Sequence, residues 1–257
     1  MKILAVGDLI GSAGIKKLRT ELSKIREQEK IDFVIVNGEN SAEGMGITEK
    51  NFHDILETKV DVITMGNHTW GKKDVFKFID HPKLIRPANY PKGVVGKGYN
   101  IYTCKNKKIA VINLIGRVDI NVLSENPFIV VKEIVEEIKN RVDIIMVDFH
   151  AEATAEKIAL GYFLDGKVTA IFGTHTHVQT ADETILEKGT AYITDIGMTG
   201  PKKSVIGMDV EASIKRFETT LPERYKIATG ECIFNGVIFE VDDKTNKVKE
   251  IKRVNLK

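Results

Sequence analysis

The sequence predicts an α/β protein with parallel strands, and three observations lead to this class. Short apolar runs recur along the chain and are typical of buried strands. Segments whose apolar residues repeat at helical spacing separate the first three runs. Most runs end at polar residues introduced by glycine. Strand and helix in alternation favour parallel pairing, with helices on the faces of the sheet.

The first half of the chain follows this alternation closely. Strands are expected at Ile3–Val6, Phe33–Val36 and Val62–Met65. The first helix is predicted from the spacing of Ile15, Leu18, Leu22 and Ile25. The second helix is expected near Thr48–Glu57, with Thr48 as its N-cap.

The second half is less regular. Tyr99–Cys104 and Ile109–Leu114 flank a polar turn and predict an antiparallel hairpin. The other expected elements are helices at 128–139 and 153–163, and strands at 143–147, 168–172, 191–196, 231–241 and 247–254. The chain shows no repeat, low-complexity linker or break in composition, so we predict a single domain over residues 1–257.

Composition sets bounds on the class of protein. The chain has 257 residues, of which 42% are hydrophobic and 29% charged, as in ordinary globular proteins. A net charge of +2 does not favour bulk electrostatic capture of nucleic acid. Cys104 and Cys232 are far apart and form no CxxC pair. With no signal peptide and no apolar run near the roughly 20 residues that span a bilayer, we predict a soluble cytoplasmic protein.

Residues able to bind a metal ion follow five of the apolar runs. They are Asp8, Glu39, Asn40, Asn67, His68, His150, His175 and His177. The carboxyl ends of strands line the ligand crevice of open α/β sheets, so these residues are expected to converge. His175 and His177 lie two residues apart, and on extended backbone their rings would point to the same side.

The residue types indicate which ions would bind. Carboxylates, amides and imidazoles together suit iron, manganese or zinc better than calcium or magnesium, which prefer oxygen ligands. The set also exceeds what one ion needs. We therefore predict a centre with two ions.

The order of these residues resembles the calcineurin-like metallophosphoesterases. That order is Asp8, Glu39, Gly66-Asn67-His68, His150 and Gly173-Thr174-His175-Thr176-His177. Two departures distinguish this chain, because Asp8 is not followed by the usual Asp-x-His histidine, and Gly38-Glu39-Asn40 stands where Gly-Asp is common. Both departures resemble the YmdB branch of bacterial proteins, which are described as 2',3'-cyclic-nucleotide phosphodiesterases.

The resemblance implies a fold and a division of the ligands. The implied fold is a four-layer α/β/β/α sandwich of mixed sheets, with the site at the C-terminal ends of the strands. One ion would take Asp8, Asn40 and His177, the other would take Asn67, His150 and His175, and Glu39 would bridge them. The ions would be divalent or trivalent, with iron as the first expectation, manganese the second and zinc the third.

The resemblance also implies a reaction. A hydroxide that bridges the metal ions would attack phosphorus, and His68 would act as general acid toward the leaving ribose oxygen. The substrate would be a 2',3'-cyclic nucleotide or an RNA end that carries this group. A homo-oligomer, either dimer or tetramer, is expected from the resemblance alone.

Ordinary structural roles are alternatives for the individual residues. Asp8 could cap a helix, Glu39 and Asn40 could be turn residues, and His150 could be a hydrogen-bonded structural histidine. Asp148 could orient His150 or merely end a strand. The joint arrangement favours the metal site, since separate ordinary roles would have to coincide in a family-like order.

Several further residues have two readings. Trp70 could stack on a base or be a partly buried core indole, and Arg117 could bind phosphate or form a surface salt bridge. Gly197–Gly200 could form a rim turn, while His53 and His81 are expected at the surface. Arg86, Thr199 and the loop around Met45 are not assigned to the site.

Two other functions remain as alternatives. A regulatory protein could bind nucleotide or RNA with little turnover, because a metal site does not by itself set a physiological role. An amidohydrolase-type enzyme also uses His-x-His, but there the pair typically comes from the first strand. Here it comes last among the candidate ligands, which argues against that class.

Overall fold

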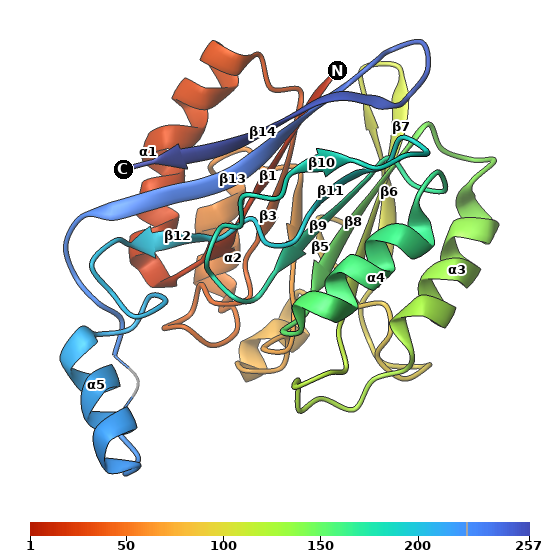
Figure 1. Ribbon diagram of the computed structural model, residues 1–257. Coiled ribbons are helices and arrows are strands. Elements are labelled where there is room, and N and C mark those ends of the chain that lie inside the picture. The colour runs from red at the N-terminus through yellow and green to blue at the C-terminus, as the bar shows by residue number, and fades with distance from the viewer. Residues whose placement is uncertain (225) are drawn as a thin grey trace.

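The computed structural model describes residues 1–224 and 226–257. Two sheets lie face to face, with α1 and α2 outside one sheet and α3 and α4 outside the other (Figure 1). The helices are α1 (Gly11–Glu29), α2 (Glu49–Leu56), α3 (Pro127–Ile138), α4 (Thr154–Leu164) and α5 (Val210–Thr219), with the 3-10 helix η1 (Lys73–Lys77). The structure therefore has the predicted four-layer α/β/β/α arrangement.

The first sheet has eight strands in the order β2-β12-β13-β1-β3-β4-β5, with β14 also paired to β13. Its parallel part comprises β1 (Lys2–Val6), β3 (Phe33–Asn37), β4 (Val62–Thr64) and β5 (Leu84–Ile85). The remaining strands are β2 (Asp8–Leu9), β12 (Met198–Pro201), β13 (Cys232–Val241) and β14 (Val248–Leu256). Because β13 runs antiparallel to β1, the sheet is mixed.

The second sheet has six strands in the order β10-β11-β9-β8-β7-β6. They are β6 (Tyr99–Cys104), β7 (Lys107–Ile115), β8 (Ile144–His150), β9 (Ala170–Thr174), β10 (Thr184–Ile185) and β11 (Ala191–Ile193). Strands β7, β8, β9 and β11 are parallel, and the two edge strands are antiparallel to their neighbours. The predicted hairpin is confirmed as β6–β7.

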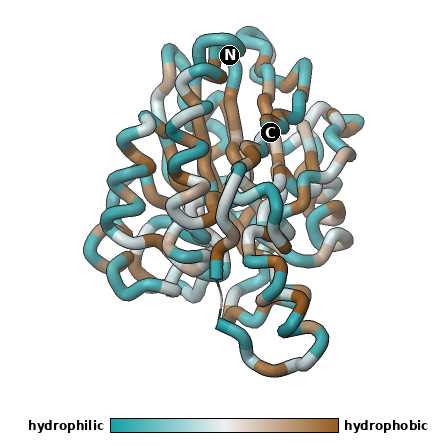
Figure 2. The backbone as a smooth tube through the Cα atoms, turned by 90° about the vertical axis from the view of Figure 1, so that its left-hand side faces the viewer, coloured by the Kyte–Doolittle hydropathy of each residue, from teal (hydrophilic) through white to brown (hydrophobic). Residues whose placement is uncertain are grey.

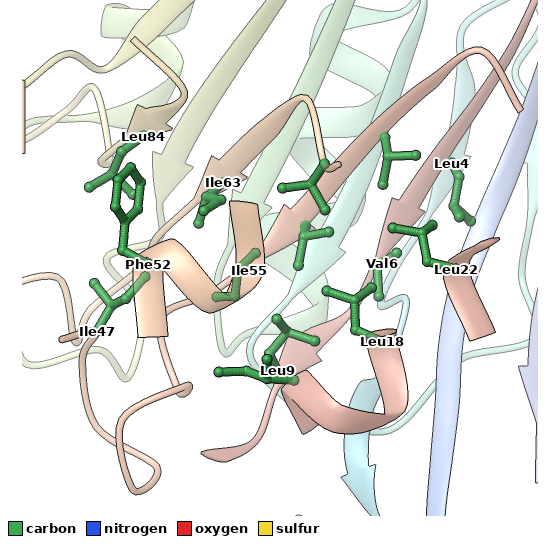
Figure 3. Packing of buried hydrophobic residues seen from close by; sticks show 14 of the residues in the cluster. Leu4, Val6, Leu9, Leu18, Leu22, Ile47, Phe52, Ile55, Ile63 and Leu84 are labelled. Atoms are coloured by element: carbon green, nitrogen blue, oxygen red, sulfur yellow. The ribbon is translucent and has the colours of Figure 1, made fainter. Parts of the chain in front are cut away.

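Successive side chains of a strand point to opposite faces of the sheet, and this alternation divides the core into layers. Leu4 and Val6 of β1 face α1, where they pack with Leu18 and Leu22 of the helix (Figure 3). The intervening Ile3 and Ala5 lie in a different cluster, which fills the space between the two sheets. A third cluster joins α3 and α4 to the second sheet. Hydrophobic residues accordingly run through the central strands of the chain trace (Figure 2).

Local signals account for the helices that were predicted. Thr48 accepts a hydrogen bond from the backbone N–H of Asn51 and caps α2, as expected. Asn126 caps α3, which has proline at its first turn. In α1, the buried positions include Ile15, Leu18, Leu22 and Ile25, the residues whose spacing predicts this helix.

The short elements β2, η1, β5 and β10 were not expected, and three larger parts of the fold also differ from expectation. Gly197–Gly200 is not a rim turn, because Met198–Pro201 forms β12 and pairs with β2 and β13. The strand expected at 191–196 ends at Ile193. Helix α5 was not predicted, and it projects from the body of the molecule without a buried residue (Figure 1). Among the described residues, no helix combines the length and apolar character needed to cross a membrane.

Candidate metal centre

The structure brings the polar residues that follow five strands to one edge of the two sheets. They lie at or just beyond the ends of β1, β3, β4, β8 and β9. Each predicted residue contacts another member of the set. These residues are Asp8, Glu39, Asn40, Asn67, His68, His150, His175 and His177. The predicted convergence at the C-terminal strand ends is therefore observed.

The Nε2 atom of His150 lies among three other side chains. It is 2.8 Å from Oδ1 of Asn67, 3.1 Å from Oε1 of Glu39 and 3.0 Å from Nδ1 of His175. One ring nitrogen carries at most one hydrogen and cannot donate to three atoms at once. Atoms bound to one ion at about 2.1 Å lie about 3 Å apart, so these separations fit the edges of a coordination shell.

Glu39 lies between two halves of the cluster. Its side chain is fully buried, and Oε1 contacts His150 on one side and the Nδ2 donor of Asn40, at 3.3 Å, on the other. Oε1 also lies 3.2 Å from Nδ1 of His68, whose backbone N–H donates to Oε2 at 3.0 Å. This position suits the bridging role expected for Glu39.

The second half of the cluster contains Asp8, Asn40 and His177. Nδ2 of Asn40 lies 3.1 Å from Nε2 of His177. Oδ2 of Asp8 accepts a hydrogen bond from the backbone N–H of His175, but its buried Oδ1 has no hydrogen-bond partner among residues 1–224 and 226–257. Asp8 does not cap α1, since Ile10 occupies the N-cap position. A buried carboxylate oxygen without a partner is suited to a cation.

Glu39 and His150 form a buried pair of opposite charges within the cluster. Burial opposes ionisation of both Glu39 and His150, but their mutual attraction outweighs it. The pKa of Glu39 is consequently held well below its ordinary value, and that of His150 is raised to about 9. Burial and the neighbouring His150 lower the pKa of His175 to about 3. A bound cation would take the place of the proton on His150.

The residues fit a metal centre on these grounds. Glu39, His150 and His175 each offer a ligand atom, and the three atoms lie within 4.8 Å of one another. The carboxylate, amide and imidazole donors around them are those that iron, manganese and zinc accept. Asn40 and Asn67 supply the amides.

The backbone of the His-x-His segment differs from expectation. β9 ends at Thr174, and His175 and His177 have φ values of 106° and 65°, so neither residue is in the extended conformation. The expectation of extended backbone at the two histidines is therefore wrong. Nδ1 of His175 faces His150 and Nε2 of His177 faces Asn40.

Partners outside the predicted set orient the histidines. Thr174 Oγ1 donates to Asp148 at 2.7 Å and lies 2.9 Å from Nδ1 of His150, so Asp148 orients His150 through this threonine. Nε2 of His175 lies 3.0 Å from Oε2 of Glu152. Neither Thr174 nor Glu152 was predicted from the sequence. Glu152 follows the strand-end residue His150 by two positions, and a carboxylate so near a predicted ligand is the sequence feature that could have indicated its role.

Of the other residues named from the sequence, the side chains of Trp70 and Arg86 have structural contacts, whereas no such contact of the Arg117 side chain is found among the described residues. Trp70 is a partly buried indole that packs against the first core and stacks on Phe76. Buried Arg86 donates to three backbone carbonyl oxygens. The side chain of Arg117 is exposed, and no salt bridge to it is found in the described part of the chain. His53 is exposed as expected, whereas His81 is half-buried and packs edge-on against Phe52.

Two facing mixed sheets between helices, with carboxylate, amide and imidazole side chains at one edge, define a metallophosphoesterase-like protein. The chain belongs to the YmdB-like protein family, whose sequence profile matches residues 4–254. The family predicted from the order of the strand-end residues is thus confirmed.

Individual relatives support the same conclusion. The 2',3'-cyclic-nucleotide 2'-phosphodiesterase of Bacillus subtilis strain 168 is 49% identical over 255 residues, which cover 99% of this chain and 96% of the relative. The crystal structure of a phosphatase from Mycoplasma pneumoniae is 40% identical, with a TM-score of 0.94 over 100% of this chain and 93% of that one. A hypothetical protein from Thermus thermophilus gives a TM-score of 0.94 at 35% identity, covering 99% of this chain and 98% of that one.

Proposed function

We propose that this chain is a dinuclear metal-dependent phosphodiesterase that hydrolyses 2',3'-cyclic nucleotides or RNA ends carrying the same group. The observation that carries the proposal is the crowding of three potential ligand atoms around one nitrogen of buried His150. The orphaned oxygen of Asp8 lies in the same cluster. The name of the Bacillus subtilis relative supports the choice of substrate.

The contacts support a division of the ligands. Asn67, His150 and His175 would hold one ion, because their ligand atoms meet at Nε2 of His150. The other ion would be held by Asp8, Asn40 and His177, and Glu39 would be shared. Such mixed ligands suit iron, manganese or zinc, and the order of choice, with iron first, manganese second and zinc third, is the one that the family resemblance implies.

Ligation by Asn40 requires one particular orientation of its amide. In the structure, Oδ1 of Asn40 lies 2.9 Å from Nδ1 of His68, and the Nδ2 donor faces His177. An amide nitrogen cannot bind the ion, so ligation needs the amide turned by 180°, which exchanges two atoms of nearly equal size. Nδ1 of His68 would then donate to Oε1 of Glu39, 3.2 Å away, and in the imidazolium form of His68 the second proton is on Nε2.

His68 is the residue assigned to proton transfer. Its Nδ1 lies 3.2 Å from Oε1 of Glu39, its side chain is 30% exposed, and no hydrogen bond to Nε2 is found among the described residues. Nε2 is therefore free to meet a substrate. As water adds to phosphorus, the bond from phosphorus to the ribose oxygen breaks, and that oxygen takes the Nε2 proton of the His68 imidazolium, which becomes neutral.

The metal ions would supply a water of lowered pKa and stabilise charge on the phosphate oxygens. This chain's residues determine where the substrate can bind. Asp8, Glu39, Asn40 and His150 are buried, whereas the other members, Asn67, His68, His175 and His177, are partly exposed and form the open side of the cluster. We place the reacting phosphate on this open side, which includes Nε2 of His68. The single domain, the cytoplasmic location and the homo-oligomer predicted from the sequence stay predictions.

The test is reconstitution followed by product analysis. Protein stripped with a chelator is loaded with Fe²⁺ or Mn²⁺ and incubated with 2',3'-cyclic AMP, and ³¹P NMR distinguishes the 2'- from the 3'-monophosphate. We expect metal-dependent turnover to the 3'-monophosphate, because cleavage of the 2' ester leaves phosphate on O3'. Fully loaded protein that turns over no cyclic nucleotide would refute the proposal.

A further inference from the structure

A buried ion pair lies behind the His-x-His turn and outside the set of metal-binding candidates. Nζ of Lys157 on α4 lies 2.7 Å from Oδ2 of Asp195, and the two side chains are 1% and 0% exposed. The desolvation cost of such a pair can cancel its Coulomb attraction, so burial alone does not show that it stabilises the fold. Its contacts indicate a more specific role.

The pair holds backbone groups on both sides of His175. Nζ of Lys157 donates to the carbonyl oxygen of Thr174 at 2.8 Å. Oδ2 of Asp195 accepts from the backbone N–H of Thr176 at 3.0 Å, and its Oδ1 accepts from Gly197 at 2.9 Å. The cation and the anion thus bind the residues immediately before and after His175.

The turn that they hold has an uncommon backbone conformation. The positive φ values of His175 and His177 persist only where surrounding structure determines them. The chain approaches closely behind the turn, where a Cβ on Gly173 would lie 1.8 Å from the carbonyl oxygen of Thr194 and 3.0 Å from Cδ of Lys157. Ile196 also donates its backbone N–H to the carbonyl of Gly173 at 2.9 Å.

We infer that Lys157 and Asp195 are positioning residues that set the His-x-His turn, and through it aim His175 and His177 at their two metal positions. Neither charged group lies among the ligand atoms, so both act through the backbone of Thr174 and Thr176. The inference rests on the proposed function, because it concerns ligands of that metal centre. It assigns a role in positioning the metal ligands to two residues that lie outside the ligand motifs.

The test compares the buried pair with a second ion pair that makes similar hydrogen bonds, although the side chains of the second pair are 27% and 31% exposed. Lys157→Met with Asp195→Asn removes both charges together, so that neither is left buried alone. The control is Arg26→Met with Asp61→Asn. Arg26 likewise donates to a carboxylate at 2.9 Å and to a carbonyl, and Asp61 accepts a backbone N–H, but this pair joins α1 to the opposite ends of the strands.

Metal binding is measured with Mn²⁺ alone, by calorimetric titration of the chelator-treated full-length chain. We expect wild type and the Arg26/Asp61 control to bind two equivalents with equal affinity. The Lys157/Asp195 double variant should lose about 10- to 100-fold in Mn²⁺ affinity, the range typical of residues that orient metal ligands. The electron paramagnetic resonance spectrum of bound Mn²⁺ should change in this variant and not in the control.

The outcomes separate the inference from the proposed function. A folded Lys157/Asp195 variant that binds Mn²⁺ like wild type overturns the inference alone, whereas wild type that binds no Mn²⁺ overturns both. Should the double variant fail to fold, Lys157→Arg replaces it. Arginine keeps the charge but moves the donors that meet Thr174, so reduced Mn²⁺ affinity supports the inference and wild-type affinity refutes it.

Discussion

Replacing Gly66 by alanine should disable the site through a single methyl group. A Cβ at this position would lie 2.3 Å from Oε2 of Glu39 and 2.3 Å from Cδ2 of His150. The backbone of Gly66 is fixed from the other side, because its carbonyl accepts hydrogen bonds from Thr69 and Tyr90. The two proposed ligands must therefore move instead.

The contacts give the size of the effect. Ordinary van der Waals contact begins near 3.4 Å, so Glu39 or His150 has to retreat by about 1 Å, a misplacement that costs an enzyme about 10²-fold in rate. Overpacking of this kind also costs about 1–3 kcal/mol of stability. The φ of Gly66 is not in the left-handed region, and the effect is accordingly steric rather than a backbone strain.

The assay is kcat/KM on 2',3'-cyclic AMP, together with metal content and thermal denaturation. Gly161→Ala is the matched control, because its Cβ would lie 2.7 Å from the Tyr192 ring, away from the cluster. It should lower stability at most, with activity and metal content unchanged. A Gly66→Ala enzyme with activity within about threefold of wild type, far short of the loss expected from misplaced ligands, would refute the geometry proposed for Glu39 and His150.

Three further predictions concern other positions of the site. His68→Ala should keep both metal ions but lose about 10²- to 10⁴-fold in kcat, as measured by metal analysis and steady-state kinetics, and an unchanged rate would rule out its role as acid. Asp148→Asn should weaken Mn²⁺ binding about tenfold through Thr174, since the amide can turn its NH₂ group toward the hydroxyl; equal calorimetric affinity would contradict this. Removing the metal ions should lower the melting temperature, because ligand at about 100 times its Kd stabilises by about 2.7 kcal/mol; equal melting of loaded and stripped protein would exclude a tight centre.

The location of the site could be predicted from the sequence because it depends on topology. Strand, helix and strand in alternation predict parallel pairing, and the carboxyl ends of parallel strands meet at one edge. Asp8 and Glu39 follow strands of the first sheet and His150 ends a strand of the second, and they lie together because the two sheets face each other with these strand ends at the same edge. The apolar periodicity of α1 and the N-cap at Thr48 are equally local signals, and both were read correctly.

The elements that were missed depend on distant partners. β2 has two residues and β12 has four, which is too short for an alternating pattern. Their pairing with each other, and that of β12 with β13, defines them as strands. α5 buries none of its residues, so no apolar stripe facing a core distinguishes it. Its N-cap Asp209, which accepts from the N–H of Ala212, was the available local signal.

The conformation of the His-x-His turn could not be predicted from the motif itself. The motif supplies two imidazoles, but their directions follow from φ values that Lys157, Asp195 and Asp8 determine from three separate elements. Asp8 illustrates the same point, because its nearest helix suggests a cap whereas its carboxylate accepts from the N–H of His175, 167 residues away. Short segments of the sequence therefore identify the candidate ligands, whereas contacts between residues far apart in the sequence determine the geometry of those ligands.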